Sequence, residues 1–436
     1  MQIFDFHLHS KYSRACSKQL DLEHIQAWCG IKGIDIIGTS DFTHPAWNKE
    51  LQKKLQPIGN GLFRLRPSEE VKRAALEVGF APPPDASRPE PVFFLSTEVS
   101  CIYSEGGKVR RIHILVAFPE LEHVQAFIKA LEKRGGKLTS DGRPILGMTA
   151  KDIAAMAIDI CEQAILVPAH AWTPWFAIFG SKSGFDSVEE CFGEYAKYIY
   201  ALETGLSSDP SMNWRLSQND KYLLVSNSDA HSLENLGREA NVLNLDTVSY
   251  DSIYKTLKNH DVGRFAYTIE FFPEEGKYHL DGHAPCGFSC EPEETKRLDG
   301  RCPKCGKRLT VGVYHRVAEL ADRAAGGKPA SAVPFKSIVP LAEILADAIG
   351  AKKATKKVQT VYRDLITKVG HEFHILLDAP IEIIAAAAGP VVAEGIRRMR
   401  AGQLTIAPGY DGIYGRVSVF SEKERGADKK AQARLF

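Results

Sequence analysis

The sequence predicts an α/β fold in which parallel strands alternate with helices and the functional residues lie where the strands end. Seven short apolar runs are interpreted as strands: residues 1–6, 34–39, 92–96, 111–118, 165–168, 199–202 and 222–226. Helical patterns lie between several of them, and strands that alternate with helices form parallel sheets. Each run ends in, or in one case carries, a histidine or an acidic residue. The carboxyl ends of strands build the active site of a parallel β/α barrel, so we expect these residues to converge.

The first run ends in His7 and His9, which have the spacing of a pair of metal ligands. Alternate side chains of an extended chain share a face, so both imidazoles point to one side. Two imidazoles suit zinc or manganese. Such a pair is also common in ordinary strands, and its interpretation therefore depends on the later strands.

The later strands supply further candidate ligands. In chain order they are Asp41 with His44, Glu98, His113, His170, Asp229 and His231, and the run 199–202 ends in Glu203. Divalent ions held by imidazoles and carboxylates polarise a phosphodiester and lower the pKa of the water that they bind. We interpret Glu98 as a bridge between metals, and Asp229 either as a ligand or as the residue that orients the nucleophile. Both are candidate catalytic residues.

This ordered set resembles the polymerase-and-histidinol-phosphatase (PHP) domain over residues 1–272. The resemblance implies a distorted seven-stranded β/α barrel with two or three divalent ions (Zn²⁺, Mn²⁺ or Mg²⁺) that hydrolyses phosphoesters. The second strand departs from the usual Thr-Asp-His because it has Ser40-Asp41-Phe42. Either His44 is the ligand there or the position is empty. Many members have a further histidine where only Cys16 stands, which leaves the third metal open.

Two predicted helices begin at clear capping residues. Residues 20–32 have Asp21 near the start and Gly33 at the stop. Thr149 and Asp152 have the spacing of a capping box, which opens a helix that runs to about residue 163.

The loop after the fifth strand is rich in aromatic residues. Trp172, Trp175 and Phe176 follow His170 closely, and they have two interpretations: core packing, or stacking against an unpaired base. Arg238 also has two interpretations: it makes a bidentate contact to a phosphate, or it forms an ion pair with Glu239.

Four cysteines close together predict a structural zinc module at residues 273–325. They are Cys286, Cys290, Cys302 and Cys305. Four thiolates at this spacing suit a closed tetrahedral Zn²⁺ site. The spacing of the first pair is loose, so His283 is an alternative to one of these ligands.

Residues 326–420 predict a helical, basic domain. Residues 326–436 contain 17 Lys and Arg against 11 Asp and Glu, whereas the rest of the chain contains 38 against 43. An acidic metal-holding barrel beside a basic domain suits a DNA substrate, although a solvated basic helix face gives the same count.

The tail, residues 421–436, is charged and ends in Gln432-Ala-Arg-Leu435-Phe436. An otherwise polar tail has no folding reason to expose Leu-Phe at its end. The ending is similar to the pentapeptide by which bacterial repair and replication proteins bind the sliding clamp.

The composition is that of a globular enzyme, with 44% hydrophobic and 25% charged residues. The first residues do not form a signal peptide, and the apolar run 381–396 is broken by charges and by Gly-Pro. We therefore expect a cytoplasmic, nucleoid-associated protein that does not bind membranes.

Taken whole, the chain resembles endonuclease Q. The resemblance depends on Asp-Phe-Thr-His-Pro at 41–45, Glu-Glu-Thr-Lys-Arg-Leu at 293–298 and Gly-Tyr-Asp-Gly-Ile-Tyr-Gly at 409–415, together with the PHP ligands and the zinc module. It implies cleavage of DNA on the 5′ side of uracil, hypoxanthine, xanthine and abasic sites, with the damaged base extruded into a pocket.

Two other functions remain open at this point. A small-molecule phosphoesterase, such as a histidinol phosphatase, would turn over simple phosphate esters and would not bind DNA. A clamp-bound adaptor with a weak catalytic centre would use the barrel as a scaffold, but the nearly complete ligand set argues against it.

Overall fold

The computed structural model describes residues 1–79, 88–421 and 424. Gln432, Leu435 and Phe436, the predicted clamp-binding residues, lie outside the described residues. None of the described helices is long and apolar enough to cross a membrane.

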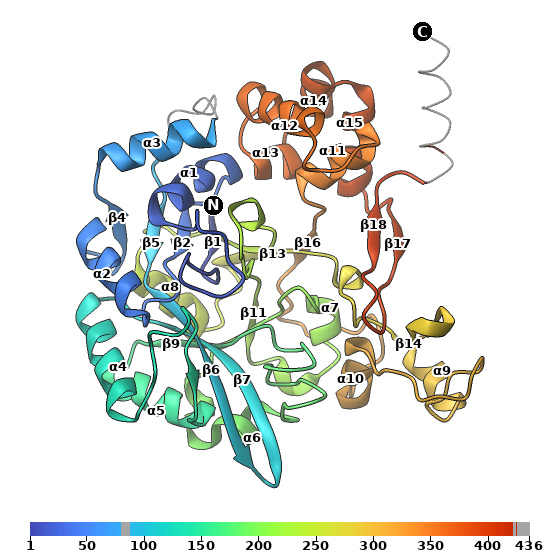
Figure 1. The fold of residues 1–436 in the computed structure, drawn as a ribbon, viewed down its shortest axis with the longest axis horizontal. Coiled ribbons are helices and arrows are strands. Elements are labelled where there is room, and N and C mark those ends of the chain that lie inside the picture. The colour runs from blue at the N-terminus through green and yellow to red at the C-terminus, as the bar shows by residue number, and fades with distance from the viewer. Residues whose placement is uncertain (80–87, 422–423, 425–436) are drawn as a thin grey trace.

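A ring of seven strands forms the predicted barrel (Figure 1). The strands are β1 (Gln2–Asp5), β2 (Ile36–Gly38), β5 (Val92–Phe94), β7 (Lys108–Ala117), β9 (Ile165–Pro168), β10 (Ala201–Glu203) and β11 (Leu223–Val225). The pairs β1–β2, β2–β5 and β10–β11 are parallel. Single parallel bridges, Leu166–Ile199 and Leu8–Ala230, join β9 to β10 and β11 to β1. The amide of Phe118 donates to the carbonyl of Leu95 between β7 and β5, which completes the ring.

One barrel strand runs against the predicted direction. Strand β7 is antiparallel to both β6 (Ser96–Glu105) and β9. The cause is the tight hairpin at Gly106 and Gly107, whose φ angles of 59° and 73° favour glycine. Because β7 enters the barrel from the opposite end, His113 reaches the site from within its strand. The β6–β7 ribbon projects well beyond the barrel (Figure 1).

Helices surround the barrel, and their ends confirm the predicted caps. The main covering helices are α1 (Leu22–Lys32), α4 (Leu121–Lys133), α5 (Ala150–Ile160) and α8 (Tyr250–Lys258). Asp21 accepts the His24 amide at the start of α1, and Gly33 ends it with φ 88°. Thr149 and Asp152 form both bonds of the capping box of α5. Shorter elements complete this part: α2 (Pro45–Lys54), β3 (Leu55–Pro57), β4 (Phe63–Leu65), α3 (Glu69–Val78), β8 (Ile145–Leu146), α6 (Val188–Phe192) and α7 (Pro210–Asn213).

The barrel sheet extends across the predicted domain boundary at residue 326. Strand β12 (Ala240–Leu243) pairs antiparallel with β1 and with β13 (Phe265–Glu270). Strand β16 (Phe335–Ser337), from the segment predicted to be helical, then pairs in parallel with β13. An unpaired edge strand exposes its backbone polar groups, and β16 covers that edge. The helical part proper therefore begins after β16.

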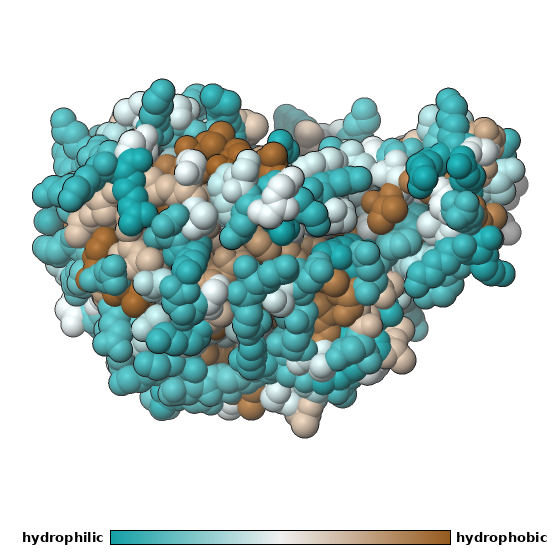
Figure 2. All heavy atoms as spheres, turned by 90° about the horizontal axis from the view of Figure 1, so that it is seen from below, coloured by the Kyte–Doolittle hydropathy of each residue, from teal (hydrophilic) through white to brown (hydrophobic). Residues whose placement is uncertain are grey.

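The accessory elements lie to one side of the barrel (Figure 1). The cysteine-rich segment holds β14 (Asp281–His283), β15 (Phe288–Cys290), α9 (Pro292–Arg297) and α10 (Val313–Leu320). The C-terminal helices are α11 (Leu341–Ile349), α12 (Lys356–Lys368), α13 (Glu372–Leu377), α14 (Ile381–Ala388) and α15 (Pro390–Arg400). A ribbon of β17 (Thr405–Ala407) and β18 (Arg416–Ser418) follows and lies between those helices and the cysteine-rich segment. Figure 2 shows a mostly hydrophilic surface, broken by separate hydrophobic patches, on both the barrel and this narrower extension.

Candidate metal centre

Three overlapping groups of histidines and carboxylates lie at the predicted end of the barrel. They are His7, His9 and Glu98; His9, Asp229 and His231; and Glu98, His113 and His170. In each group the potential ligand atoms lie within 4.8 Å of one another. The structure thus brings together seven of the predicted ligands from strands that are far apart in the sequence.

Glu98 lies at the junction of the groups. Its carboxylate oxygens are 2.6 Å from His113 Nδ1, 3.1 Å from His170 Nε2 and 3.4 Å from His9 Nε2. Burial alone would favour the neutral acid. However, the electrostatic attraction of His113 and Arg143 holds the pKa of Glu98 well below its usual value. The carboxylate is therefore ionised and suited to a bridging position.

Asp229 faces the first two histidines. Its Oδ1 is 3.1 Å from His9 Nε2 and 3.6 Å from His7 Nε2. These three atoms are buried, and none makes a hydrogen bond within the described part of the chain. Buried polar atoms are normally satisfied. Two imidazole nitrogens and a carboxylate oxygen that converge without partners fit a divalent cation.

A second layer of side chains orients the imidazoles. Glu203 contacts His7 Nδ1 at 3.0 Å, and Thr173 Oγ1 contacts His170 Nδ1 at 3.1 Å. Asp41 Oδ1 is 3.1 Å from His9 Nδ1. A partner on one ring nitrogen fixes the tautomer and leaves the other nitrogen free for a metal. The sequence marked Glu203 only as an acid at a strand end, and its role as an orienting partner is visible only in three dimensions.

The two predicted ligands of the second strand lie outside the three groups. Asp41 is behind His9, where its Oδ2 also accepts from the amide and the hydroxyl of Ser10, at 2.7 Å each. The His44 ring stacks on Tyr12, with centroids 4.6 Å apart, at the start of α2. The structure therefore places Asp41 as a partner of a ligand, and it leaves His44 away from the centre.

Three residues of the site adopt left-handed backbone conformations although they are not glycine. The φ angles of Asp41, His170 and Asp229 are 49°, 30° and 44°. Each residue lies two to four positions after the end of a strand, in the turn that carries its side chain to the site. Such conformations are strained and are found mainly at functional sites.

Arg143 is a site residue that sequence reasoning missed. Its Nη1 donates to Glu98 Oε2 at 2.9 Å, from the loop that precedes β8. The neighbouring Gly142 packs so closely that an added Cβ would lie 2.2 Å from Asp41 Oδ2. The only sequence signal was a Gly-Arg-Pro loop without a recognised motif.

A cavity of about 750 Å³ adjoins the metal centre. It lies between the barrel loops and the segment 271–279 and is bordered by Arg238, Thr173 and Phe176. Phe176 stacks near His113, with centroids 4.7 Å apart, and Arg238 donates to the carbonyl of Ser228 at 2.8 Å and to that of Asp229 at 3.2 Å. Residues that line the cavity therefore contact the candidate ligands His170, His113 and Asp229 directly. Its other aromatic and cationic lining residues include Trp175, Phe271, Tyr278, Tyr414, Arg111 and Lys277.

The structure places the predicted substrate-binding residues in different surroundings. Trp172 is only 1% exposed and its Nε1 donates to Asn213 Oδ1 at 2.8 Å, so the prediction that it stacks on a base is wrong. Trp175 is 40% exposed and lines the cavity with Phe176. Arg238 makes no ion pair with Glu239 within the described part of the chain and instead holds the backbone of the Asp229 turn, while its contact to a phosphate stays a prediction.

The two tryptophans should respond differently to truncation. Trp172→Ala is expected to lower the free energy of unfolding by about 3–5 kcal/mol, because it empties a buried site. Trp175→Ala should leave that free energy nearly unchanged, since the side chain is exposed. Chemical denaturation of both variants measures this, and a larger loss in Trp175→Ala would contradict the assignment of Trp172 to the core.

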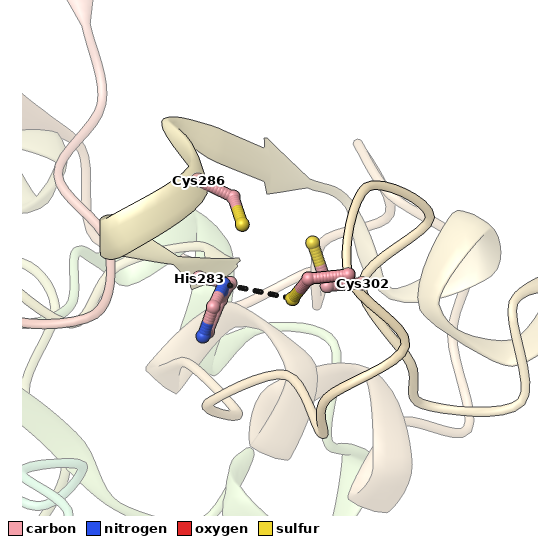
Figure 3. A group of neighbouring side chains, drawn as sticks. His283, Cys286 and Cys302 are labelled. Atoms are coloured by element: carbon pink, nitrogen blue, oxygen red, sulfur yellow. Dashed lines mark hydrogen bonds between the residues drawn. The ribbon is translucent and has the colours of Figure 1, made fainter.

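The cysteine cluster differs from the predicted set in one member. His283, Cys286, Cys302 and Cys305 offer ligand atoms within 4.8 Å of one another. Figure 3 shows that the first three point toward a common centre. Cys290 lies outside the group, with its Sγ 3.3 Å from Thr295 Oγ1. The cause is local, since β14 and β15 pair His283 with Phe288 and leave Cys290 at the far end of the hairpin.

The chain around Cys302 has the form of a zinc knuckle. The Cys302 carbonyl accepts from the amide of Gly306 at 2.8 Å. Lost solvation opposes the thiolate, but the amides of Lys304 and Cys305 donate to the sulfur and lower the pKa of Cys302. Three sulfurs and one imidazole form a donor set that fits a structural Zn²⁺ ion.

Known proteins match this chain over different lengths. Residues 340–403 match the MJ0043 C-terminal domain family. The uncharacterized protein MJ0043 of Methanocaldococcus jannaschii is 33% identical over 264 residues, or 58% of this chain, and this chain spans only 32% of that longer protein. The uncharacterized protein YqxK of Bacillus subtilis is 30% identical over 387 residues, which are 88% of this chain and 89% of YqxK.

Two crystal structures match nearly the whole chain. The lesion-specific endonuclease PfuEndoQ from Pyrococcus furiosus superposes with a TM-score of 0.81 and 30% identity, over 98% of both chains. Endonuclease Q in complex with a 27-mer duplex substrate, with an abasic lesion at the active site, superposes with a TM-score of 0.80 and 32% identity, over 97% of both chains. The chain therefore belongs to the endonuclease Q family.

Proposed function

We propose that this protein is a metal-dependent DNA repair endonuclease. It hydrolyses the phosphodiester on the 5′ side of deaminated bases (uracil, hypoxanthine and xanthine) and of abasic sites. The observation that carries the proposal is the junction of the three ligand groups at Glu98, directly beside a 750 Å³ cavity with aromatic and cationic walls. The relatives known as lesion-specific endonucleases support the same substrate class.

The ligand groups would hold two or three divalent ions: Zn²⁺, Mn²⁺ or Mg²⁺. Bound there, such ions would polarise the phosphodiester and make hydroxide available at neutral pH. Glu98 is poised to bridge two ions, because its two oxygens face different histidines. Asp229 Oδ1 faces the first pair of histidines, where it would act as a ligand or orient the attacking water.

The remaining residues of the site position the substrate. Arg143 is the one arginine or lysine that contacts Glu98 within the described residues, and it would face the scissile phosphate. Arg238 fixes the turn that carries Asp229. Trp175 and Phe176 offer ring faces on which an extruded base would stack, with a preference for weakly paired lesions because they leave the helix at lower cost.

The proposal is tested by offering the two substrate classes side by side. With Mn²⁺ or Mg²⁺ we expect turnover of a duplex that contains one uracil, hypoxanthine or abasic site, and little turnover of an undamaged duplex. Histidinol phosphate and p-nitrophenyl phosphate should be poor substrates. Efficient hydrolysis of these small esters without cleavage of any damaged DNA would favour the small-molecule alternative and contradict the proposal.

The tail is proposed to bind the bacterial sliding clamp through Gln432, Leu435 and Phe436. Support comes from the sequence alone, since a charged segment ends in an apolar pair. Deletion of 432–436 should abolish binding to immobilised clamp while nicking of a short damaged duplex stays at the wild-type rate. Scrambling the same five residues is the matched control for composition, and unchanged clamp affinity after deletion would refute this assignment.

A further inference from the structure

We propose that Tyr414 inserts into the DNA duplex and fills the gap that the extruded nucleotide leaves. This inference rests on the proposed function and assigns a positioning role to a residue outside the metal centre. Tyr414 lies in the turn 409–415, which joins β17 to β18 and reaches the cavity beside the metals.

The turn 409–415 is anchored along its length to the segment 274–280. The amide of Gly409 donates to the Glu274 carbonyl at 2.8 Å, and the amide of Gly415 donates to the Glu275 carbonyl at 3.1 Å. Between them, Gly412 donates to the Lys277 carbonyl at 2.9 Å. A turn held at its start, middle and end presents its side chains in fixed positions.

A side chain within the turn adds a further anchor, and the glycines are required by packing. Asp411 accepts from the Ala284 amide at 2.6 Å and from Thr310 Oγ1 at 2.5 Å. A Cβ added to Gly409 would lie 2.4 Å from the carbonyl oxygen of Gly276, and one added to Gly415 would meet the Glu274 carbonyl oxygen at 2.0 Å. The sequence of the turn is therefore constrained by tight contact with the backbone beneath it.

On this rigid support two apolar side chains remain in solvent. Tyr414 is 72% exposed and Ile413 is 43% exposed. Tyr410, in the same turn, packs against the protein instead: its backbone forms a β-bridge with Leu280, and its side chain lies on Gly282. The turn thus uses one tyrosine for packing and presents the other, which no folding requirement explains.

The surroundings of Tyr414 favour DNA as the partner. Lys277 Nζ lies 5.7 Å from the centroid of its ring, and Arg416 follows two residues later with an exposed side chain. A flat ring beside a cation suits the base and the phosphate that alternate along a strand. Trp175 and Phe176 come to the same cavity from the barrel loop, so an extruded base and the gap it leaves would each meet an aromatic side chain.

The role follows from the cost of extrusion. Taking a nucleotide out of the stack breaks its stacking with both neighbours, and a side chain wedged into the step restores part of that contact. Replacing a stacking aromatic residue by alanine typically weakens binding by about 10- to 100-fold per base. Loss of Tyr414 should therefore slow cleavage without any effect on the metals.

The experiment compares Tyr414→Ala and Tyr414→Phe with the wild-type protein on a duplex with one abasic site. We expect kcat/KM to fall about 10- to 100-fold in the alanine variant and to recover in the phenylalanine variant, since stacking needs the ring and not the hydroxyl. Ile406→Ala is the matched control because Ile406 is an exposed apolar residue (39%) of the same ribbon that does not line the cavity. It should keep wild-type activity.

A second readout reports the insertion itself. With 2-aminopurine beside the lesion and Ca²⁺ in place of the catalytic metal, the wild-type and Tyr414→Phe proteins should quench the fluorescence, whereas Tyr414→Ala should leave it bright. Normal kcat/KM in Tyr414→Ala, failure of phenylalanine to restore it, or equal fluorescence in all three proteins would overturn the inference. A wild-type protein that nicks no damaged duplex would instead refute the proposed function.

Discussion

Asp229→Asn is expected to nick a damaged duplex at least about 1,000-fold more slowly than the wild type, at the upper end of what one preorganised charge contributes to a rate. In the wild type, Asp229 Oδ1 faces His7 and His9 without a hydrogen bond, so the charge is available to a metal or to the attacking water. The amide has nearly the same shape and lacks the charge. Single-turnover nicking of an abasic duplex measures the effect.

The controls separate chemistry from folding. Asp246→Asn removes a carboxylate that is 92% exposed and paired only loosely with Arg264, and it should leave the rate unchanged. Thermal unfolding of Asp229→Asn should remain one cooperative transition with a lowered midpoint. Burial opposes the charge of Asp229, but the attraction of His7 and His9 holds the pKa of this carboxyl below its usual value, so the charge stabilises the fold. A rate within tenfold of the wild type would show that the centre around Asp229 does not carry the reaction.

The second large effect is expected in the cysteine cluster. Cys302→Ser should lose one equivalent of bound zinc and unfold the segment 273–325, because a structural Zn²⁺ ion supplies about 10–16 kcal/mol of apparent binding free energy in small zinc domains. Nicking should fall as well, since Lys277 and Tyr278 of this segment line the cavity. Metal analysis after gel filtration and proteolysis of the segment are the measurements.

The choice between Cys290 and His283 as a ligand is tested by the same assay. Cys290→Ser should keep the zinc, because Cys290 contacts Thr295 and lies outside the group. His283→Ala should lose most of the zinc affinity. The reverse pattern, with zinc lost from Cys290→Ser and kept in His283→Ala, would restore the four-cysteine site that the sequence predicts.

The features that depend on local sequence were predictable. The strands are short apolar runs, and the caps of α1 and α5 involve residues only a few positions apart. His7, His9, His170 and Asp229 each lie within four positions after the end of a strand. Because strand ends of a β/α barrel converge, this local rule was enough to predict one common site.

The features that depend on distant contacts were not predictable. Whether Asp41 binds a metal directly or orients His9 is decided by a left-handed turn that leaves no trace in the sequence. Trp172 and Trp175 stand three positions apart in one loop, and only the position of Asn213 shows which of them is buried. Arg143 reaches Glu98 from 45 residues away.

The position of the cut distinguishes a lesion-specific endonuclease from a nonspecific nuclease. A duplex with one uracil, labelled at one end of either strand, is incubated with the metal-loaded protein, and the products are resolved at single-nucleotide length. We expect one nick, directly 5′ of the uracil and on that strand alone, which disappears with EDTA and in Asp229→Asn. Cuts at random positions, or a nick that survives EDTA, would contradict this expectation.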